Sequence, residues 1–268
     1  SLDISIDAGY ADNGNLDELD LNAGGDTLAV DGVSYTFPLG DKTTVFVGDN
    51  MDGSTLFSTA CVYGGPTIQL DDCGNSGAAF AAGKGTAAGA SYDFGNGFTV
   101  ATGYAGPESG IATLESADAY GFNAAYTGDN YGISVTYGVT DNAAFTDTPD
   151  NTGFTADEYT ALNAYYTPES AGSLPSISGG FEAGTVTGGT DTSQWFVGLQ
   201  WDEVGAGTLG AALGTYGHIA DGATEYYMYE AFYSYPMNDG MTITPVVFIK
   251  ETSGDDETGL MVKTSFSF

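Results

Sequence analysis

Strict alternation of apolar and small polar residues is the feature that most constrains how this chain can fold. In the segment 131–140, Tyr131, Ile133 and Val135 alternate with glycine, serine and threonine. The same period of two recurs at 2–10, 194–202 and 260–268. A period of two places the two sets of side chains on opposite faces of a β-strand. The sequence therefore predicts an all-β protein whose strands have one apolar face and one small polar face.

The composition excludes several other classes of protein. The chain has 268 residues with 36 Asp and Glu against four Lys and no Arg, so its formal net charge is −32. It lacks the basic surface that a nucleic-acid-binding protein needs. The 41 glycines disfavour a helical bundle, because each costs about 1 kcal/mol inside a helix. Hydrophobic residues make up 42%, which argues against intrinsic disorder, and no run of about 18 apolar residues predicts a membrane-spanning helix.

Aromatic residues stand near the ends of the predicted apolar faces. Rings at this level form the interfacial girdles of a membrane barrel, while small residues on the other face suit a wide, wet interior. Ordinary sheet aromatics in a soluble sandwich, or in an acidic β-protein adapted to high salt, are the alternatives. The predicted girdle comprises Phe98, Tyr104, Tyr120, Tyr126, Tyr131, Tyr137, Trp195, Trp201 and Phe268.

The links between the predicted strands alternate between two kinds. Short links are expected at 95–97, 128–130, 167–174, 203–207 and 236–240, and they alternate with mostly longer links at 107–116, 141–156, 187–191, 217–223 and 252–257. This order is typical of an up-and-down outer-membrane barrel. A propeller would instead repeat every 40 to 45 residues or so.

The strand count predicts about sixteen strands. About fifteen are visible, whereas bacterial barrels have an even number. If the strand at 1–10 runs in the same direction as the last one, antiparallel closure needs one more strand, most simply before Ser1. The first ten residues do not resemble a signal peptide, so either a signal was removed or the chain is part of a longer one.

The longest stretch without a clear strand is 51–85, and it contains both cysteines. Cys61 and Cys73 are twelve positions apart. In an oxidising periplasm such a pair is expected to form a disulfide, worth roughly 3 kcal/mol in the chain-entropy model. Two free buried thiols are the alternative. The spacing excludes CxxC redox chemistry, and no four Cys or His stand at zinc-binding spacing.

Nothing in the sequence singles out a catalytic centre or a cofactor site. His218 is the only histidine, so a Ser-His-Asp hydrolase would have to use it, and no GxSxG motif is present. A histidine in a solvated loop is the simpler interpretation. Acidic clusters such as Asp71–Asp72 and Asp255–Glu257 could attract Ca²⁺ or Mg²⁺, but no calcium-binding loop motif exists and solvated loops explain them. We expect no enzyme activity, no cofactor and no resident metal.

Three segments and the chain end resemble the cyanobacterial outer-membrane porins of the carbohydrate-selective porin superfamily. They are YTFPLGDKTTVFVGDN (35–50), GASYDFGNGFTVATGY (89–104), YPMNDGMTITPVVFIKE (235–251) and the ending KTSFSF (263–268). The resemblance covers the barrel but no S-layer-homology domain, so it assigns no cell-wall anchor here. It implies a homotrimer in the bacterial outer membrane that passes small solutes and inorganic ions. It does not choose between inorganic ions, iron and sugars.

The resemblance also favours folding of the loop 51–85 into the pore, with Asp71, Asp72 and Lys84 at the constriction. A loop that merely caps the mouth is the alternative. The absence of Arg removes the arginine ladder of general porins, and a carboxylate-lined pore predicts cation preference. A closed barrel with a structural or surface-interaction role remains the other hypothesis. The charges expected to face the lumen are Asp3, Asp7, Glu18, Asp20, Glu182, Asp202, Glu230, Lys42, Lys250 and Lys263.

Overall fold

The computed structural model of the chain describes residues 1–7, 27–67, 70, 73–79, 85–107, 118–141, 156–169 and 174–267. These residues form an all-β structure. The strands are β1 (Leu2–Asp7), β2 (Ala29–Pro38), β3 (Thr43–Met51), β4 (Gly85–Asp93), β5 (Phe98–Gly106), β6 (Ala119–Thr127), β7 (Tyr131–Asp141), β8 (Ala156–Tyr166), β9 (Ser176–Thr185), β10 (Thr192–Val204), β11 (Gly207–Thr215), β12 (Ile219–Ala220), β13 (Tyr227–Asn238), β14 (Met241–Lys250) and β15 (Glu257–Phe266).

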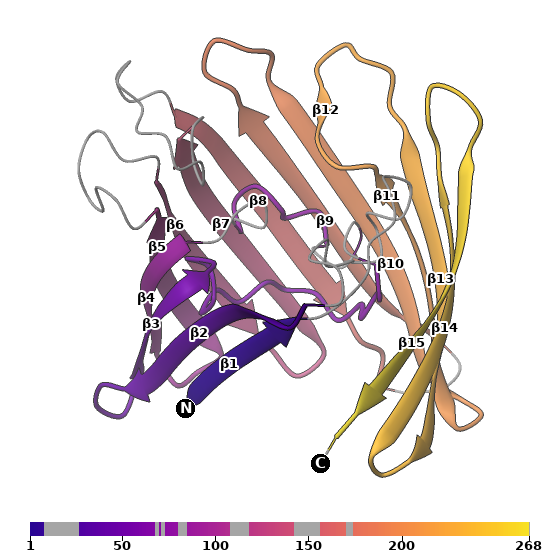
Figure 1. Cartoon of the computed structure of the whole chain (residues 1–268), viewed down its shortest axis with the longest axis horizontal. Helices are drawn as coiled ribbons and strands as arrows, with labels where there is room; N and C mark the ends of the chain where they lie inside the picture. The colour runs from indigo at the N-terminus through magenta and orange to yellow at the C-terminus, as the bar shows by residue number, and fades with distance from the viewer. Residues whose placement is uncertain are drawn as a thin grey trace.

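All the strands belong to one 15-stranded antiparallel sheet in which neighbours in sequence are neighbours in space. The one departure is the two-residue strand β12, which pairs with β10 beside the main path. The sheet curls on itself, and its two edges, β1 and β15, face each other across a gap (Figure 1). The predicted up-and-down topology is confirmed. No helix in the described residues is long and apolar enough to span a membrane.

The direction of the first strand differs from the expectation. β1 pairs directly with β2, with Leu2 opposite Tyr35, and thirteen successive antiparallel pairings lead from β1 to β15. An odd number of reversals means that β1 and β15 run in opposite directions. The prediction of a further strand before Ser1, which assumed that the first and last strands run in the same direction, was therefore wrong. The two edge strands already have the relative direction that antiparallel closure requires.

The two faces of the sheet have the reverse of the polarity of a soluble protein. On β7, Tyr131, Ile133 and Val135 are 50%, 46% and 47% exposed, whereas Ser134 and Thr136 on the opposite face are 1% and 0% exposed. The same inversion extends around the sheet, since many of its exposed side chains are large and apolar. We call the face that carries Ser134 and Thr136 the inner face, and the apolar one the outer face.

The described residues of the predicted girdle share the outer face, and four of them stand near the ends of β5 and β6. Phe98 lies opposite Tyr126 at one end of β5, and Tyr104 lies opposite Tyr120 at the other end. Six residues of extended chain separate Phe98 from Tyr104, which corresponds to ~20 Å. Tyr131, Tyr137, Trp195 and Trp201 likewise share the outer-face alternation of their strands, and Phe268 lies outside the described residues.

Candidate functional site

The described part of residues 52–79, here called the inner segment, crosses the inner face of the sheet (Figure 1). It leaves the end of β3, runs along several strands, turns, and comes back toward its start, where the Ser54 hydroxyl donates a hydrogen bond to the Ala79 carbonyl. The predicted disulfide between Cys61 and Cys73 is present and joins its two halves. We call residues 58–67 the outward arm and residues 73–79 the return arm.

Polar side chains of β6, β7 and β9 accept hydrogen bonds from the backbone of the outward arm. Asn123 of β6 accepts from Ser58 N at 2.9 Å and also donates to the Ser58 carbonyl. Ser134 of β7 accepts from Ala60 N at 2.8 Å, and Ser178 of β9 accepts from Val62 N at 3.0 Å and from Tyr63 N at 3.2 Å. An irregular chain buried against a sheet needs such partners, because unpaired backbone groups are costly. The inner segment thus lies on the small polar face of the strands and is hydrogen-bonded to it.

Glu230 of β13 binds the far end of the outward arm. Its carboxylate accepts hydrogen bonds from the Tyr63 hydroxyl at 2.6 Å and from Thr67 N at 3.1 Å. Tyr63 is 5% exposed and Glu230 is 3% exposed. Burial, together with the charge and the hydrogen bond of Glu230, raises the pKa of the Tyr63 phenol well above its usual range. Tyr63 therefore stays protonated and donating.

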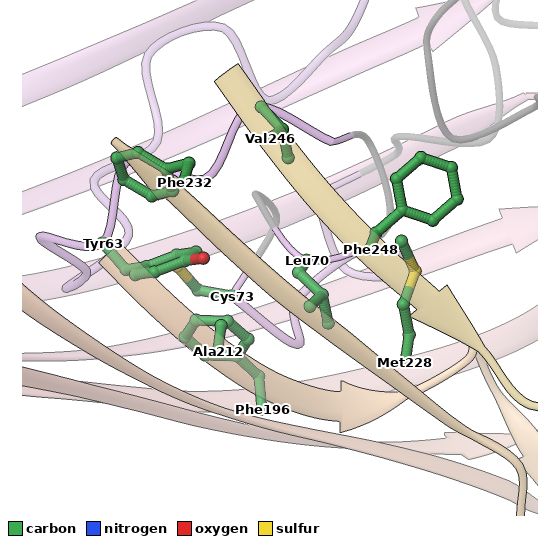
Figure 2. Packing of buried hydrophobic residues seen from close by; sticks show 9 residues of the cluster. All are labelled: Tyr63, Leu70, Cys73, Phe196, Ala212, Met228, Phe232, Val246 and Phe248. Atoms are coloured by element: carbon green, nitrogen blue, oxygen red, sulfur yellow. The ribbon is translucent and has the colours of Figure 1, made fainter. Parts of the chain in front are cut away.

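An apolar cluster packs Tyr63, Leu70 and Cys73 against the inner face of the sheet (Figure 2). Leu70 is 1% exposed, and the Tyr63 ring lies 5.3 Å from Phe196 and 5.6 Å from Phe232, centroid to centroid. Burial of this many rings and aliphatic side chains contributes roughly 1.5–3 kcal/mol per fully buried side chain. The cluster comprises Tyr63, Leu70, Cys73, Phe196, Ala212, Met228, Phe232, Val246 and Phe248.

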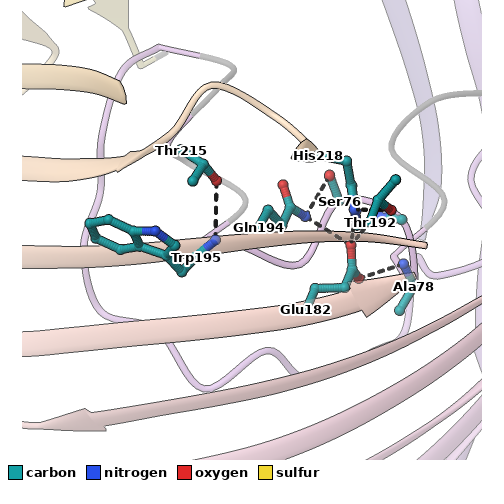
Figure 3. A network of polar contacts seen from close by, with 9 residues as sticks. Ser76, Ala78, Glu182, Thr192, Gln194, Trp195, Thr215 and His218 are labelled. Atoms are coloured by element: carbon teal, nitrogen blue, oxygen red, sulfur yellow. Dashed lines mark hydrogen bonds and ion pairs between the residues drawn. The ribbon is translucent and has the colours of Figure 1, made fainter. Parts of the chain in front are cut away.

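A second carboxylate, Glu182 of β9, binds the return arm (Figure 3). It accepts hydrogen bonds from Gly77 N at 2.8 Å and Ala78 N at 2.7 Å, and its side chain is completely buried. Gln194 Nε2 lies 2.8 Å from Glu182 Oε1, and His218 Nε2 lies 2.6 Å from the same atom. Four nitrogen atoms of the protein therefore surround one buried carboxylate.

His218 is held on both sides. Its Nδ1 lies 2.9 Å from the Thr192 hydroxyl, and its ring packs edge-on against Tyr159 with 5.1 Å between centroids. The order hydroxyl, imidazole, carboxylate is that of hydrolase triads. Here, however, the carboxylate already accepts three other hydrogen bonds, two of them from the return arm. This constellation holds the backbone of the return arm in place.

Two glycines allow the inner segment to approach the sheet closely. A Cβ at Gly103 of β5 would collide with the Gly53 carbonyl oxygen, and a Cβ at Gly180 of β9 would collide with the Cys73 carbonyl oxygen. The Cys73 carbonyl also accepts a hydrogen bond of 2.7 Å from Asn163 of β8. The absence of side chains at these two positions is what lets the backbone of the inner segment lie directly on the strands.

The candidate charges occupy several different environments. The proposed constriction residues Asp71, Asp72 and Lys84 lie outside the described residues, as do Glu18, Asp20 and the side chain of Asp7. Glu182 and Glu230 share the inner face but are buried by the inner segment. The residues of that face that remain exposed include Asp3, Asp202 and Lys263.

The two other predicted lumen lysines contact protein groups. Lys42 lies in the turn before β3 rather than within a strand, and its Nζ donates to the Phe94 carbonyl at 3.0 Å. Lys250 is 8% exposed, with its Nζ 3.8 Å from Glu257 Oε2 and 4.0 Å from the centre of the Tyr216 ring. Within the described part of the chain, no group of three or more His, Cys, Asp or Glu is arranged to hold a metal ion.

Sequence reasoning missed the phenylalanines of the inner face. Phe46, Phe196, Phe232 and Phe248 are at most 4% exposed, although they share a face with glycine, serine and threonine. Their signal was present, since each is a bulky residue at a small-residue position of the alternation. All four lie directly opposite a glycine on a neighbouring strand: Phe46 opposite Gly89, Phe196 opposite Gly180 and Gly214, Phe232 opposite Gly210 and Phe248 opposite Gly259.

No protein-family model matches the sequence, and no curated protein matches it. Solved structures of bacterial porins do match over most of the chain. The anion-selective porin from Comamonas acidovorans has a TM-score of 0.62 at 13% identity, with 100% of this chain and 99% of that one covered. OprB from Pseudomonas putida at high pH has a TM-score of 0.64 at 13% identity, with 94% and 76% covered. A mutant of the Rh. blastica porin has a TM-score of 0.59 at 14% identity, with 92% and 80% covered. The chain therefore has a porin fold.

Proposed function

We propose that the protein is an outer-membrane porin through which small hydrophilic solutes and ions diffuse passively. The observation that carries this proposal is the inverted polarity of the sheet, with apolar side chains exposed on the outer face and a polar inner face crossed by the inner segment. Exposed apolar surface of this extent is unfavourable in water and favourable in a bilayer. The porin fold of the matching structures supports the same function.

The outer face fits a bilayer in height as well as in polarity. The two levels of aromatic residues on β5 and β6 are separated by ~20 Å, close to the ~25 Å apolar band of outer-membrane barrels. The rings at each level are Phe98 with Tyr126, and Tyr104 with Tyr120. We infer that these rings, with the remaining predicted girdle residues, lie at the two membrane interfaces, where amphipathic aromatic side chains are favoured.

The inner segment is the element that we propose narrows the pore. Its backbone is hydrogen-bonded to strands from β6 to β13, so it follows one side of the barrel wall. The proposal keeps Asp71, Asp72 and Lys84 as constriction residues on the sequence argument alone, since all three lie outside the described residues. Solute size would then be limited by the segment and not by the wider sheet.

The charge of the protein supports a preference for cations. The formal net charge is −32, and Asp3 and Asp202 are exposed on the inner face. Carboxylates concentrate cations where the pore radius is comparable with the Debye length of about 8 Å at physiological salt. Glu182 and Glu230 contribute little to this effect at the pore surface, because the inner segment covers them.

The resemblance of the sequence to cyanobacterial porins extends the proposal to a homotrimer in a bacterial outer membrane, with a diffusion pore in each subunit and no resident cofactor or enzymatic activity. A second candidate is a closed barrel with a structural or surface-interaction role. The observation that favours it is the apolar cluster around Tyr63 and Phe196, which occupies inner-face space on β10, β11, β13 and β14.

Single-channel recording in planar bilayers tests the proposal. Purified protein, folded in detergent, should give discrete and stable conductance steps, and a salt gradient should give a reversal potential of the sign that cation preference requires. Folded protein that inserts without conductance would favour the closed barrel. Protein that stays soluble without detergent would exclude both membrane hypotheses.

A further inference from the structure

We propose that Glu182 and His218 form a proton-sensitive latch that positions the return arm and thereby sets how firmly the inner segment is held. This inference rests on the proposed porin function for its consequence, but its structural basis is independent of ion flow. The two residues belong to different elements of the barrel, since Glu182 lies within β9 and His218 lies just before β12.

The latch acts through Glu182, which is the point of attachment of the return arm. The carboxylate is completely buried and accepts Gly77 N and Ala78 N, the last part of the arm to contact the sheet by hydrogen bonds in the described residues. Ser76 is tied to the same place, because its hydroxyl accepts from Gln194 Nε2 at 2.7 Å. A charged carboxylate is costly to bury unless hydrogen-bond donors surround it. The attachment of the return arm to Glu182 therefore depends on each of these donors.

His218 is the one of these donors whose side chain can hold a proton on one ring nitrogen or on both. A neutral imidazole that donates to Glu182 from Nε2 must accept from Thr192 at Nδ1, whereas an imidazolium donates at both nitrogens and the threonine hydroxyl can rotate to accept. Protonation therefore keeps both contacts and converts the bond to Glu182 into a charge-assisted pair, which is the stronger form. The pair is partly shielded, with side-chain exposures of 19% for His218 and 0% for Glu182.

The surroundings of the latch are acidic or neutral in the described residues. Besides Glu182, the Tyr159 phenol of β8 faces the His218 ring, and Asp157 lies next to Tyr159. Asp191 and Asp221 flank the β10–β12 pairing on the same rim, with Asp221 N bonded to the Asp191 carbonyl. His218 is the only histidine of the sequence, and histidine is the side chain that ordinarily changes charge between pH 5 and 8.

The test compares wild type, His218→Gln and Glu230→Gln at pH 5.5 and 8.5. Glu230→Gln is the matched control, because Glu230 binds the outward arm with the same chemistry and without a histidine. In planar bilayers, transient excursions of the open-channel current should be about fivefold rarer at pH 5.5 than at pH 8.5 in wild type, the effect of gaining roughly one charge-assisted hydrogen bond. His218→Gln should lose this dependence, and Glu230→Gln should retain it.

Hydrogen exchange of peptides that contain Gly77 and Ala78, corrected for intrinsic exchange, gives a readout that needs no channel. Wild type should protect these amides more at pH 5.5, and His218→Gln should protect them equally at both pH values. Equal protection in wild type and His218→Gln at pH 5.5 would overturn the latch even if the channel conducts. A protein that shows the expected exchange but no conductance would instead overturn the porin function and leave the latch standing.

Discussion

The hydroxyl of Tyr63 donates a 2.6 Å hydrogen bond to Oε1 of Glu230, which joins two residues 167 positions apart in the chain. Both groups are buried, and Thr67 N is the other donor to the same carboxylate. The outward arm is therefore attached at its far end by a single acidic side chain of β13.

Replacement of Tyr63 by Phe should weaken this attachment. The ring still fills its place between Phe196 and Phe232, so the change removes mainly the hydroxyl. A hydrogen bond to a charged group contributes about 1.5–3 kcal/mol, and the loss leaves Glu230 with fewer donors. We therefore expect Tyr63→Phe to lower the free energy of unfolding by about this amount, seen as a lower midpoint of denaturant unfolding in detergent. An unchanged midpoint would show that Glu230 does not depend on Tyr63.

Alkaline pH should have the same effect as this substitution. Burial and Glu230 raise the pKa of Tyr63 above the ordinary value near 10. Because the folded protein holds this proton more tightly than the unfolded chain, the related stability is present below pH 10 or so and is lost as the pH rises above it. Unfolding measured at pH 8 and pH 11 should show a smaller decrease in Tyr63→Phe than in wild type. The comparison with Tyr63→Phe isolates this residue from the other 17 tyrosines.

The disulfide should stabilise the inner segment more than the barrel. Cys61 and Cys73 lie in the segment and close a loop within it, whereas the sheet is held by its own ladders. Loop closure over this distance is worth about 3 kcal/mol in the chain-entropy model. The double variant Cys61→Ser, Cys73→Ser should therefore become sensitive to proteolysis within residues 58–79, while the strand content seen by circular dichroism stays the same. If strand content fell together with resistance to proteolysis, the barrel itself would depend on the disulfide.

The alternation of side chains made most of the fold predictable. On β7 and β10 the apolar and small polar residues follow the period of two closely enough to give the strands, and the alternating links gave their order. The relative direction of β1 was not predictable in the same way, since it depends on β1 pairing with β2, and an alternating pattern does not state which strands are neighbours.

The candidate site was predictable only in part. Glu182 and Glu230 were placed on the inner face by the alternation of side chains, and both were expected to be charged residues that line the lumen. The alternation does not reveal what covers a side chain. Their burial arises from the inner segment, whose path has no periodic pattern to follow. His218 was interpreted as a solvated loop residue, because its contact with Glu182 joins positions 36 residues apart.

Because the return arm lies directly on β9, alanine substitutions at the adjacent glycines Gly179 and Gly180 should have different effects. A Cβ at Gly180 would meet the Cys73 carbonyl oxygen, whereas a Cβ at Gly179, on the other face, would meet only the Phe196 carbonyl oxygen at an ordinary 3.7 Å. We expect Gly180→Ala to displace residues 73–75 and to increase hydrogen exchange there several-fold, and Gly179→Ala to leave exchange as in wild type. Similar behaviour of the two variants would show that the arm does not rest on β9 as described.

Ion preference should respond to the exposed charges of the inner face and not to the buried ones. Asp202→Asn removes a carboxylate exposed on β10, and Lys263→Gln removes an ammonium group exposed on β15. If the pore is cation-preferring, Asp202→Asn should move the reversal potential in a salt gradient toward zero, and Lys263→Gln should move it away from zero.

The dependence of these two shifts on ionic strength serves as a control. Both shifts should shrink as the ionic strength rises from 0.1 M to 1 M, because the Debye length falls from about 10 Å to about 3 Å. Asp239→Asn, in the turn between β13 and β14, alters the net charge by the same amount as Asp202→Asn but lies outside the strands of the wall. An equal shift in Asp239→Asn would assign the preference to the overall charge of the protein, and a reversal potential of anion-preferring sign in wild type would contradict the proposed selectivity itself.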